Sequence, residues 1–317
     1  MVGFPCPNKR VGLLEPQNFM THHRKFAFLK ALLGLGFLVV VLAGQLGAQE
    51  KSFLWKVNSN QNSLHILGSI HLLNKEAYPL KQSIENAFDE SKKLIFEIDL
   101  RSANPERIQQ LMLQKSATAD GTLLQQNVST ETYKAVAVRA KELGIDIRQL
   151  SPFKPWVVAM TMAAVKLQKL GFDPQLGIDR YFAERAKRSN KPTDGLETAE
   201  FQLDLFDQFS AKEQELLLRQ SMNEMDHVER NVTEIVRSWK SGDVGAVEKH
   251  LLVGMHEYPE IHRKIIDDRN RRWLPQIESL LAARGDNAMI VVGAAHLVGK
   301  NGVIELLKAR GYSVEQQ

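Results

Sequence analysis

The chain contains two matching phrases, one near each end: residues 64–72 read LHILGSIHL and residues 289–297 read MIVVGAAHL. In each phrase an apolar run with β-branched residues is followed by Gly-x-x-His-Leu. Such a run predicts a buried strand, and a glycine at its end lets the backbone turn and approach a ligand closely. Ligands of α/β sheets collect outside the carboxyl ends of strands. We therefore expect two distant segments to bring His71 and His296 into one crevice, and an active site there is the leading hypothesis.

The segments around these phrases predict how the rest of the chain is organised. Strands are expected at 53–57, 63–68, 93–99, 288–292 and about 312–315, and helices at 79–91 and 303–310. The section from about 101 to 285 is mostly helical, with amphipathic helices that include 155–170, 177–190, 199–209, 211–240 and 261–283, the last bent at Pro275. The sequence therefore predicts an α/β fold of some α+β character. Its central mixed sheet is built from both ends of the chain, with a large helical middle section.

The first 48 residues have the pattern of a secretory signal peptide. From Met20, basic residues precede an apolar stretch to Ala43, and small residues end at Ala48. Cleavage after Ala48 would leave an exported domain, residues 49–317, that is periplasmic or secreted. The alternative is an uncleaved anchor, because the apolar stretch is near the lower limit of roughly 17 residues for a spanning helix. Any membrane contact would then be through this leader alone. Residues 1–19 lie upstream of the pattern, so Met20 is an alternative start of translation.

Setting the leader aside changes what charge and cysteine content imply. The formal net charge of the chain is +4, and residues 1–48 carry five Lys or Arg against one Glu, which leaves residues 49–317 close to neutral. A neutral domain gives no reason to expect nucleic acid as a partner. The single cysteine, Cys6, lies in the leader, so neither a disulfide nor a thiol nucleophile is expected. No phosphate-binding glycine loop is present outside the leader, so we expect no nucleotide cofactor.

A third candidate comes from the strand predicted at 93–99. Because side chains alternate along a strand, Ile95, Glu97 and Asp99 share one face. A carboxylate beside apolar residues normally needs a partner. Glu97 therefore joins the two histidines as a candidate site residue.

Further segments carry a resemblance to a known family. They read LWKV before the first phrase, then IFEID, GID…F, DGLET, W…GD, DDRN, and GAAHLVG…GV…L…GY. Together they resemble the TraB/GumN family, which is grouped with the Tiki metalloproteases and, more distantly, with erythromycin esterases and ChaN-like proteins. The resemblance covers residues 52–315. It places the functional positions of the family on Gly68, His71, Glu97, Arg269, Asn270, Gly293 and His296.

The resemblance implies a hydrolase and leaves two mechanisms open. The Tiki branch implies a Mn²⁺- or Co²⁺-dependent protease. His71 and His296 would be metal ligands, Glu97 a ligand or the base, and Arg269 would stabilise the oxyanion. Zn²⁺ is less expected, and Asp99 could add the oxygen ligand that a hard metal prefers. The esterase branch implies metal-free chemistry, in which His71 is the base, Glu97 orients its imidazole, and His296 with Arg269 stabilises developing charge.

Non-catalytic interpretations remain open beside these two. Either histidine could be an ordinary core or capping residue, and Arg269 could serve only as an ion-pair partner of Glu97. Asn270 is expected to cap or orient, and the two motif glycines to shape the backbone. An exported protein that captures a peptide without cleaving it is the alternative of a different class. Under the enzyme hypothesis, the partner is a peptide or protein substrate.

Overall fold

The computed structural model describes residues 51–99, 101, 104–118, 120–252 and 258–317. The predicted signal peptide, its cleavage point after Ala48 and the alternative start at Met20 lie outside the described residues. The described residues belong to one compact unit, Glu50–Gln317. Among them, no helix has both the length and the apolar character needed to cross a membrane.

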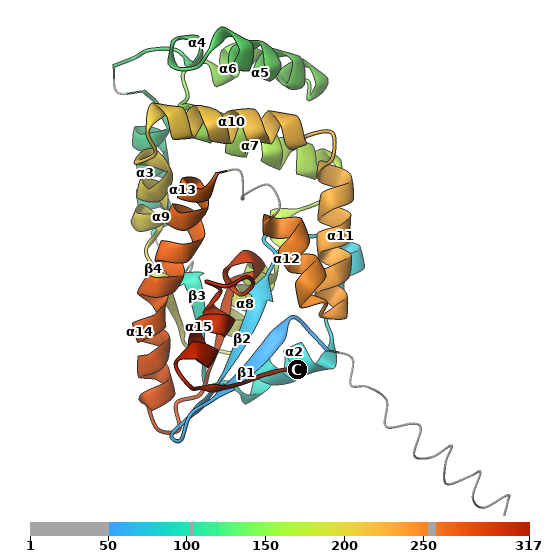
Figure 1. Cartoon of the computed structure of the whole chain (residues 1–317), viewed down its shortest axis with the longest axis vertical. Helices are drawn as coiled ribbons and strands as arrows, with labels where there is room; N and C mark the ends of the chain where they lie inside the picture. Colours follow the sequence, from blue (N-terminus) through green and yellow to red (C-terminus); the bar gives the residue numbers. More distant parts are fainter. Residues whose placement is uncertain (1–50, 100, 102–103, 119, 253–257) are drawn as a thin grey trace, which may run out of the picture. The chain divides into compact units, whose positions relative to one another are not determined.

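Both ends of the chain build one mixed sheet, as predicted (Figure 1). In the described part of the chain its strand order is β4-β3-β5-β2-β1-β6. Four neighbouring strands run parallel, whereas β1 is antiparallel to both β2 and β6. The strands are β1 (Leu54–Asn58), β2 (Ser63–Ser69), β3 (Lys93–Ile98), β4 (Thr193–Glu197), β5 (Ala288–Gly293) and β6 (Ser313–Gln316).

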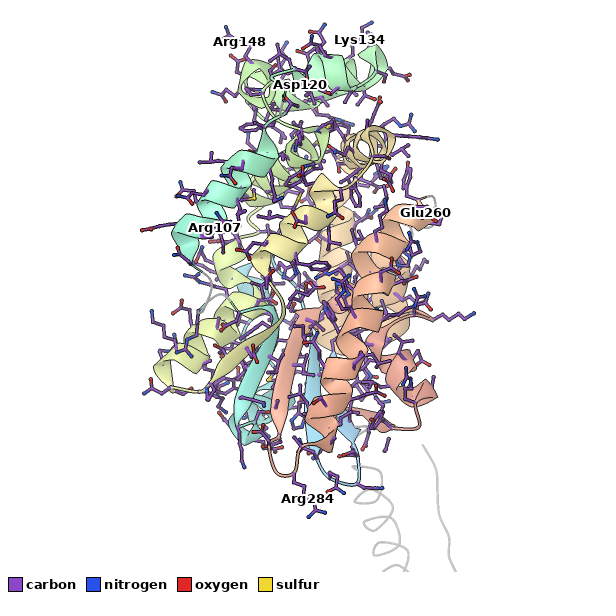
Figure 2. The ribbon with its side chains drawn as sticks, turned by 90° about the vertical axis from the view of Figure 1, so that its left-hand side faces the viewer. Arg107, Asp120, Lys134, Arg148, Glu260 and Arg284 are labelled. Carbon is purple, nitrogen blue, oxygen red and sulfur yellow. The ribbon has the colours of Figure 1, made fainter. Side chains whose placement is uncertain are left out.

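Helices cover both faces of the sheet. The crossovers through α2 (Gln82–Glu90) and α8 (Ile178–Arg188) lead towards β4, whereas those through α14 (Asp268–Ala282) and α15 (Val303–Ala309) lead towards β6. Right-handed crossovers that lead in opposite directions place their helices on opposite faces. Figure 2 shows the sheet between α8 and α14. All six residues of β5 are buried, as expected for a parallel strand covered on both faces.

The helical section has a hydrophobic core of its own, separate from that of the sheet. Its centre includes Val136, Val158, Met162, Leu218 and Met222, all buried. The helices of this section are α3 (Pro105–Ser116), α4 (Leu124–Asn127), α5 (Thr130–Glu142), α6 (Ile147–Leu150), α7 (Pro155–Lys169), α9 (Ala199–Asp207), α10 (Ala211–Glu224), α11 (Val228–Ser241), α12 (Val244–Leu252) and α13 (Pro259–His262). Short 3₁₀ turns lie at η1 (Lys75–Ala77), η2 (Pro174–Leu176) and η5 (Ala294–His296).

Two of the predicted helices differ from the structure. The helix expected at 211–240 is broken into α10 and α11, because the two halves pack into different cores: Met222 contributes to the helical core and Trp239 to the core of the sheet. The helix expected at 261–283 contains a π-helical segment, η4 (Arg263–Asp267), before α14 begins. Pro275 lies inside α14. The middle section also supplies a full edge strand, β4, where a turn or short strand was expected.

Candidate active site

The two Gly-x-x-His phrases meet at the point where the sheet changes its winding direction. Their strands, β2 and β5, are parallel neighbours, with Gly68 opposite Val292. The chain leaves β2 towards α2 on one face and leaves β5 towards α15 on the other. Diverging connections of this kind open a crevice at the carboxyl ends of the strands. His71 and His296 both follow strand ends there.

A cavity of about 510 Å³ occupies this crevice. Its polar lining includes His71, Glu97, Arg269 and His296, which come from four separate parts of the chain. The rest of its lining is largely apolar. The sequence-predicted histidines, acid and arginine therefore border one space, whose volume lies in the range typical of small-ligand sites.

Asp179 holds the imidazole of His71. The Nδ1 atom of His71 is 2.7 Å from Oδ2 of Asp179, and the Ser69 hydroxyl donates to Oδ1 of the same carboxylate at 3.0 Å. The negative charge of Asp179 raises the pKa of His71 to about 9. The His71 side chain is 59% exposed, so its free nitrogen, Nε2, is accessible from the cavity.

The first turn of α8 fixes the loop that carries His71. Gly177 precedes the helix, and a Cβ atom added to it would lie 2.2 Å from the carbonyl oxygen of His71. The N–H of Ile178 donates to the carbonyl of Ile70 at 3.1 Å. Asp179 then lies in the first helical turn, where a carboxylate is favourable because of the helix dipole. In the Gly-Ile-Asp sequence, Gly177 thus allows close approach of the backbone, Ile178 donates a backbone hydrogen bond, and Asp179 pairs with His71.

His296 is buried and held in one tautomer. The amide nitrogen of Asn270 donates to the carbonyls of His296 and Asn301, so its Oδ1 accepts from Nδ1 of His296 at 2.7 Å. Nε2 of His296 accepts from Nη1 of Arg269 at 3.0 Å. Burial lowers the pKa of His296 to about 3. The ring is therefore neutral, and both of its nitrogens already have partners.

Arg269 links two carboxylates at the ends of β3 and β4. Its Nη2 donates to Glu97 at 2.5 Å and to Glu197 at 2.8 Å, and its Nε also donates to Glu197. Its Nη1 donates to His296 and to the carbonyl of Ile265 in the π-helical segment, at 3.1 Å. An arginine side chain has five N–H donors, and all five are used here. Arg269 therefore has no donor left for the oxyanion of a substrate in this arrangement.

Glu97 is held as a carboxylate by several donors. Its Oε1 accepts from the N–H of Gly293 at 2.7 Å, and its Oε2 accepts from Gln202 at 3.0 Å as well as from Arg269. Burial opposes ionisation, but His296, Arg269 and the Gly293 N–H outweigh it and lower the pKa of Glu97 to about 2. Glu97 was expected to orient the imidazole of His71. In the structure Asp179 does so instead, through its hydrogen bond with Nδ1 of His71.

The two motif glycines have different surroundings. A Cβ atom on Gly293 would lie 3.1 Å from Oε1 of Glu97 and 3.5 Å from Nε2 of His71, so this glycine leaves the centre of the site open. Gly68 lies inside β2, and a Cβ atom there would meet the ring of Phe53 at 2.4 Å. The carbonyl of Gly68 accepts from Nε1 of Trp239 at 2.6 Å. The expectation that Gly68 forms a turn beside a substrate is therefore wrong, and its role is close packing.

Asp99 lies at a different cavity. That cavity has a volume of about 380 Å³ and is also lined by Asn104, Asp194 and Glu197. The Oδ1 atom of Asp99 accepts from the backbone N–H of Arg101 at 3.1 Å. The structure thus places Asp99 apart from His71, and its predicted role as an additional metal ligand has no geometric support.

Comparison with known proteins identifies the family of the chain. The family model described as TraB/PrgY/gumN matches residues 53–316. The chain belongs to the TraB/PrgY/gumN family. Among its TraB/PrgY/gumN relatives is the uncharacterized protein YbaP of Escherichia coli K12, 23% identical over 77% of this chain and 87% of YbaP. No solved structure matches.

Two relatives of this TraB/PrgY/gumN protein are named metalloproteases. Metalloprotease TIKI1 of Danio rerio is 23% identical over 83% of this chain, and Metalloprotease TIKI2 of Xenopus tropicalis is 24% identical over 87% of it. The match spans 63% of each of these two proteins, which is less than two thirds of their length.

The side chains of this TraB/PrgY/gumN site do not fit the predicted three-ligand metal centre as they stand. Two imidazoles and a carboxylate are suitable donors, but Arg269 occupies Nε2 of His296 and Oε2 of Glu97. A metal centre of His71, Glu97 and His296 would require the guanidinium to leave. In the described part of the chain, no three His, Cys, Asp or Glu residues are grouped so that they could hold a metal ion.

Three residues of the site were not singled out from the sequence. Asp179 and Glu197 lie in the GID and DGLET segments that carried the family resemblance, but neither had an assigned role. The position of Glu197 at the end of β4 follows the same rule that identified Glu97, since both acids end parallel strands. Gln202, one turn into α9, gave no signal in the sequence.

Proposed function

We propose that this protein is an exported hydrolase of peptide bonds in which His71 removes a proton from the attacking water. The observation that carries the proposal is the pairing of His71 with Asp179 at the open side of the cavity. Nδ1 donates to Asp179, so the lone pair of the neutral ring lies on Nε2, which faces the cavity. A carboxylate that orients a histidine and stabilises its protonated form is a recurrent device of hydrolases.

The proton and the charge can be followed through the reaction. Water held at Nε2 of His71 attacks the carbonyl carbon while its proton passes to Nε2. The imidazolium that forms is stabilised by Asp179, and its positive charge lies beside the developing oxyanion. His71 then returns the proton to the amine nitrogen as the tetrahedral intermediate collapses and its C–N bond breaks, which releases the amine and the carboxylic acid. In this scheme Arg269, His296 and Glu97 position the floor of the site and touch no reacting atom by themselves.

The raised pKa of His71 predicts how such an activity would depend on pH. A base must be unprotonated, and the pKa of His71 is about 9. Hydrolysis by the free enzyme should therefore increase with pH until about 9 and level off above it.

A peptide library analysed by mass spectrometry tests the proposal. The protein is purified from the fraction in which it accumulates and is incubated in EDTA or with added Mn²⁺ or Co²⁺. Cleavage in EDTA that is lost in His71→Ala supports the proposal. Cleavage only with added metal, together with metal lost from His71→Ala and His296→Ala, would replace His71 as base by a metal-dependent mechanism. Stoichiometric loss of peptide without products, unchanged by His71→Ala, would indicate capture instead of catalysis.

Export is part of the same proposal and rests on the pattern of residues 20–48. Fractionation of cells that produce the full chain, compared with cells that produce it without residues 20–48, tests it. Retention of both forms in the cytoplasm would refute export.

A further inference from the structure

We infer that the substrate places a large apolar side chain, of the size of Leu or Phe, next to the bond that is cut. This inference rests on the proposed function and names its substrate class. The evidence is an apolar wall on the side of the cavity opposite the sheet. The wall consists of Met160 on α7, Leu205 and Phe206 on α9, Val232 and Ile235 on α11, and Leu251 on α12.

The wall and the charged floor share one helix face. Gln202, Leu205 and Phe206 are spaced i, i+3 and i+4 on α9, and such residues lie on one side of a helix. Gln202 donates to Glu97 at 3.0 Å, so this side of α9 faces the floor of the site. A group that contacts Leu205 or Phe206 therefore lies within one helical turn of the residues around Glu97.

A second helix joins the wall to the strand that carries His71. Val232 and Ile235 are three residues apart on α11, and Trp239, one turn further, donates to the carbonyl of Gly68 in β2. This bond attaches α11 to the strand that leads to His71.

The wall leaves apolar surface open beside the site. None of its six side chains is fully buried, and Met160 is 49% exposed. Single exposed apolar residues are common, but apolar residues from four helices that border one cavity mark a binding site. The charged side chains that line the cavity are confined to the floor. A peptide bound with its carbonyl near His71 would therefore meet the wall with a neighbouring side chain.

The size and chemistry of the cavity set the expected selectivity. A volume of about 510 Å³ accommodates a large side chain together with the adjoining backbone. Burial of apolar surface favours Leu or Phe over Ala, and a Lys side chain would lose hydration without gaining a partner from the wall. We expect discrimination of about 10- to 100-fold.

The experiment uses acetylated and amidated peptides that differ at one position, with Phe, Leu, Ala or Lys before a constant Gly-Ala. Binding to the full chain carrying His71→Ala is measured by calorimetry, so that the peptide is not consumed. Hydrolysis is measured with the unchanged protein. The expected result is binding of the Phe and Leu peptides about tenfold or more tighter than binding of the Ala and Lys peptides.

Matched variants assign any preference to the wall. Met160→Gln with Leu205→Asn replaces two wall residues by polar residues of similar shape, and neither belongs to a hydrophobic core. The control, Met112→Gln with Leu113→Asn, makes the same changes at exposed positions of α3 that do not line this cavity. The wall variant should lose most of the preference, and the control should keep it.

The outcomes separate the two proposals. Equal binding of all four peptides, no binding of any, or a preference that survives in the wall variant overturns the inference about the side chain. Preferential binding of Phe and Leu peptides without products leaves that inference standing and refutes the hydrolase. Products formed at equal rates from all four peptides would support the hydrolase and overturn the inference about the side chain.

Discussion

Replacement of Asp179 by Asn is the most direct test of how the site is organised. Asn has nearly the same shape as Asp but no charge, so the variant removes the main cause of the raised pKa of His71 and little else. The carboxylate of Asp179 is 2.7 Å from Nδ1 of His71 and also accepts from Ser69. If the pair acts as proposed, the variant protein should fold but its His71 should titrate at a lower pH.

The size of the effect follows from the structure. The pKa of His71 is about 9 against an ordinary value of 6.5, a difference of about 2.5. A difference of 1 in pKa corresponds to about 1.4 kcal/mol, but solvent screens a pair whose histidine is more than half exposed. We therefore expect the pKa to fall by at least about 1. Without Asp179, the charge of Glu97 still raises the pKa of His71, whereas that of Arg269 lowers it.

Histidine-labelled protein observed by NMR provides the assay. The resonance of His71 is assigned by its loss in His71→Gln, and its titration is followed from pH 5 to pH 10. The control is Glu184→Gln, which removes a carboxylate from the same helix at an exposed site where it pairs with Arg180. An unchanged midpoint in Asp179→Asn, or an equal decrease in the control, would refute the assignment of Asp179 as the partner of His71.

Four further changes test the remaining contacts. Gly293→Ala puts a methyl group at the centre of the site and should reduce hydrolysis by up to about 100-fold while the melting temperature changes by only a few degrees; normal turnover would contradict it. Gly177→Ala should push the backbone of His71 aside and lower its pKa towards 6.5 in the same NMR titration. Arg269→Met leaves two buried carboxylates without their partner and should cost about 3–5 kcal/mol of unfolding free energy in urea, and a loss below about 1 kcal/mol would refute its structural role. His296→Gln should flatten the pH dependence of stability, because the folded-state pKa of His296 is about 3: its contribution is present above pH 6.5 and is lost as the pH falls through about 3.

The sequence predicted the sheet and the meeting of its strand ends because both follow from local patterns of apolar and polar residues. The apolar runs before His71 and His296 predicted buried strands, and their positions near the two ends of the chain predicted a sheet built from both ends. The side-chain alternation of β3 located Glu97 in the same way. These features need only the period of a strand and the rule for where parallel strands end.

The pairings inside the site could not be predicted in this way. Asp179 and His71 are 108 residues apart, and their contact depends on where the first turn of α8 meets the loop after β2. All five N–H donors of Arg269 are used only because a π-helical segment places the carbonyl of Ile265 within hydrogen-bond distance of Nη1. Neither arrangement has a periodic signature, because each is set by packing between elements. The role of Gly68 was not predicted for the same reason, since the ring of Phe53 and the backbone of Ala294 leave no room there for a side chain.

The charges at the strand ends explain why His71, of the two histidines, is protonated. Asp179, Glu97 and Glu197 bring three carboxylates to this edge of the sheet, and Arg269 supplies one positive charge that is shared between Glu97 and Glu197. Asp179 is left to His71, which therefore gains a proton, whereas His296 faces the guanidinium and is buried, which keeps it neutral.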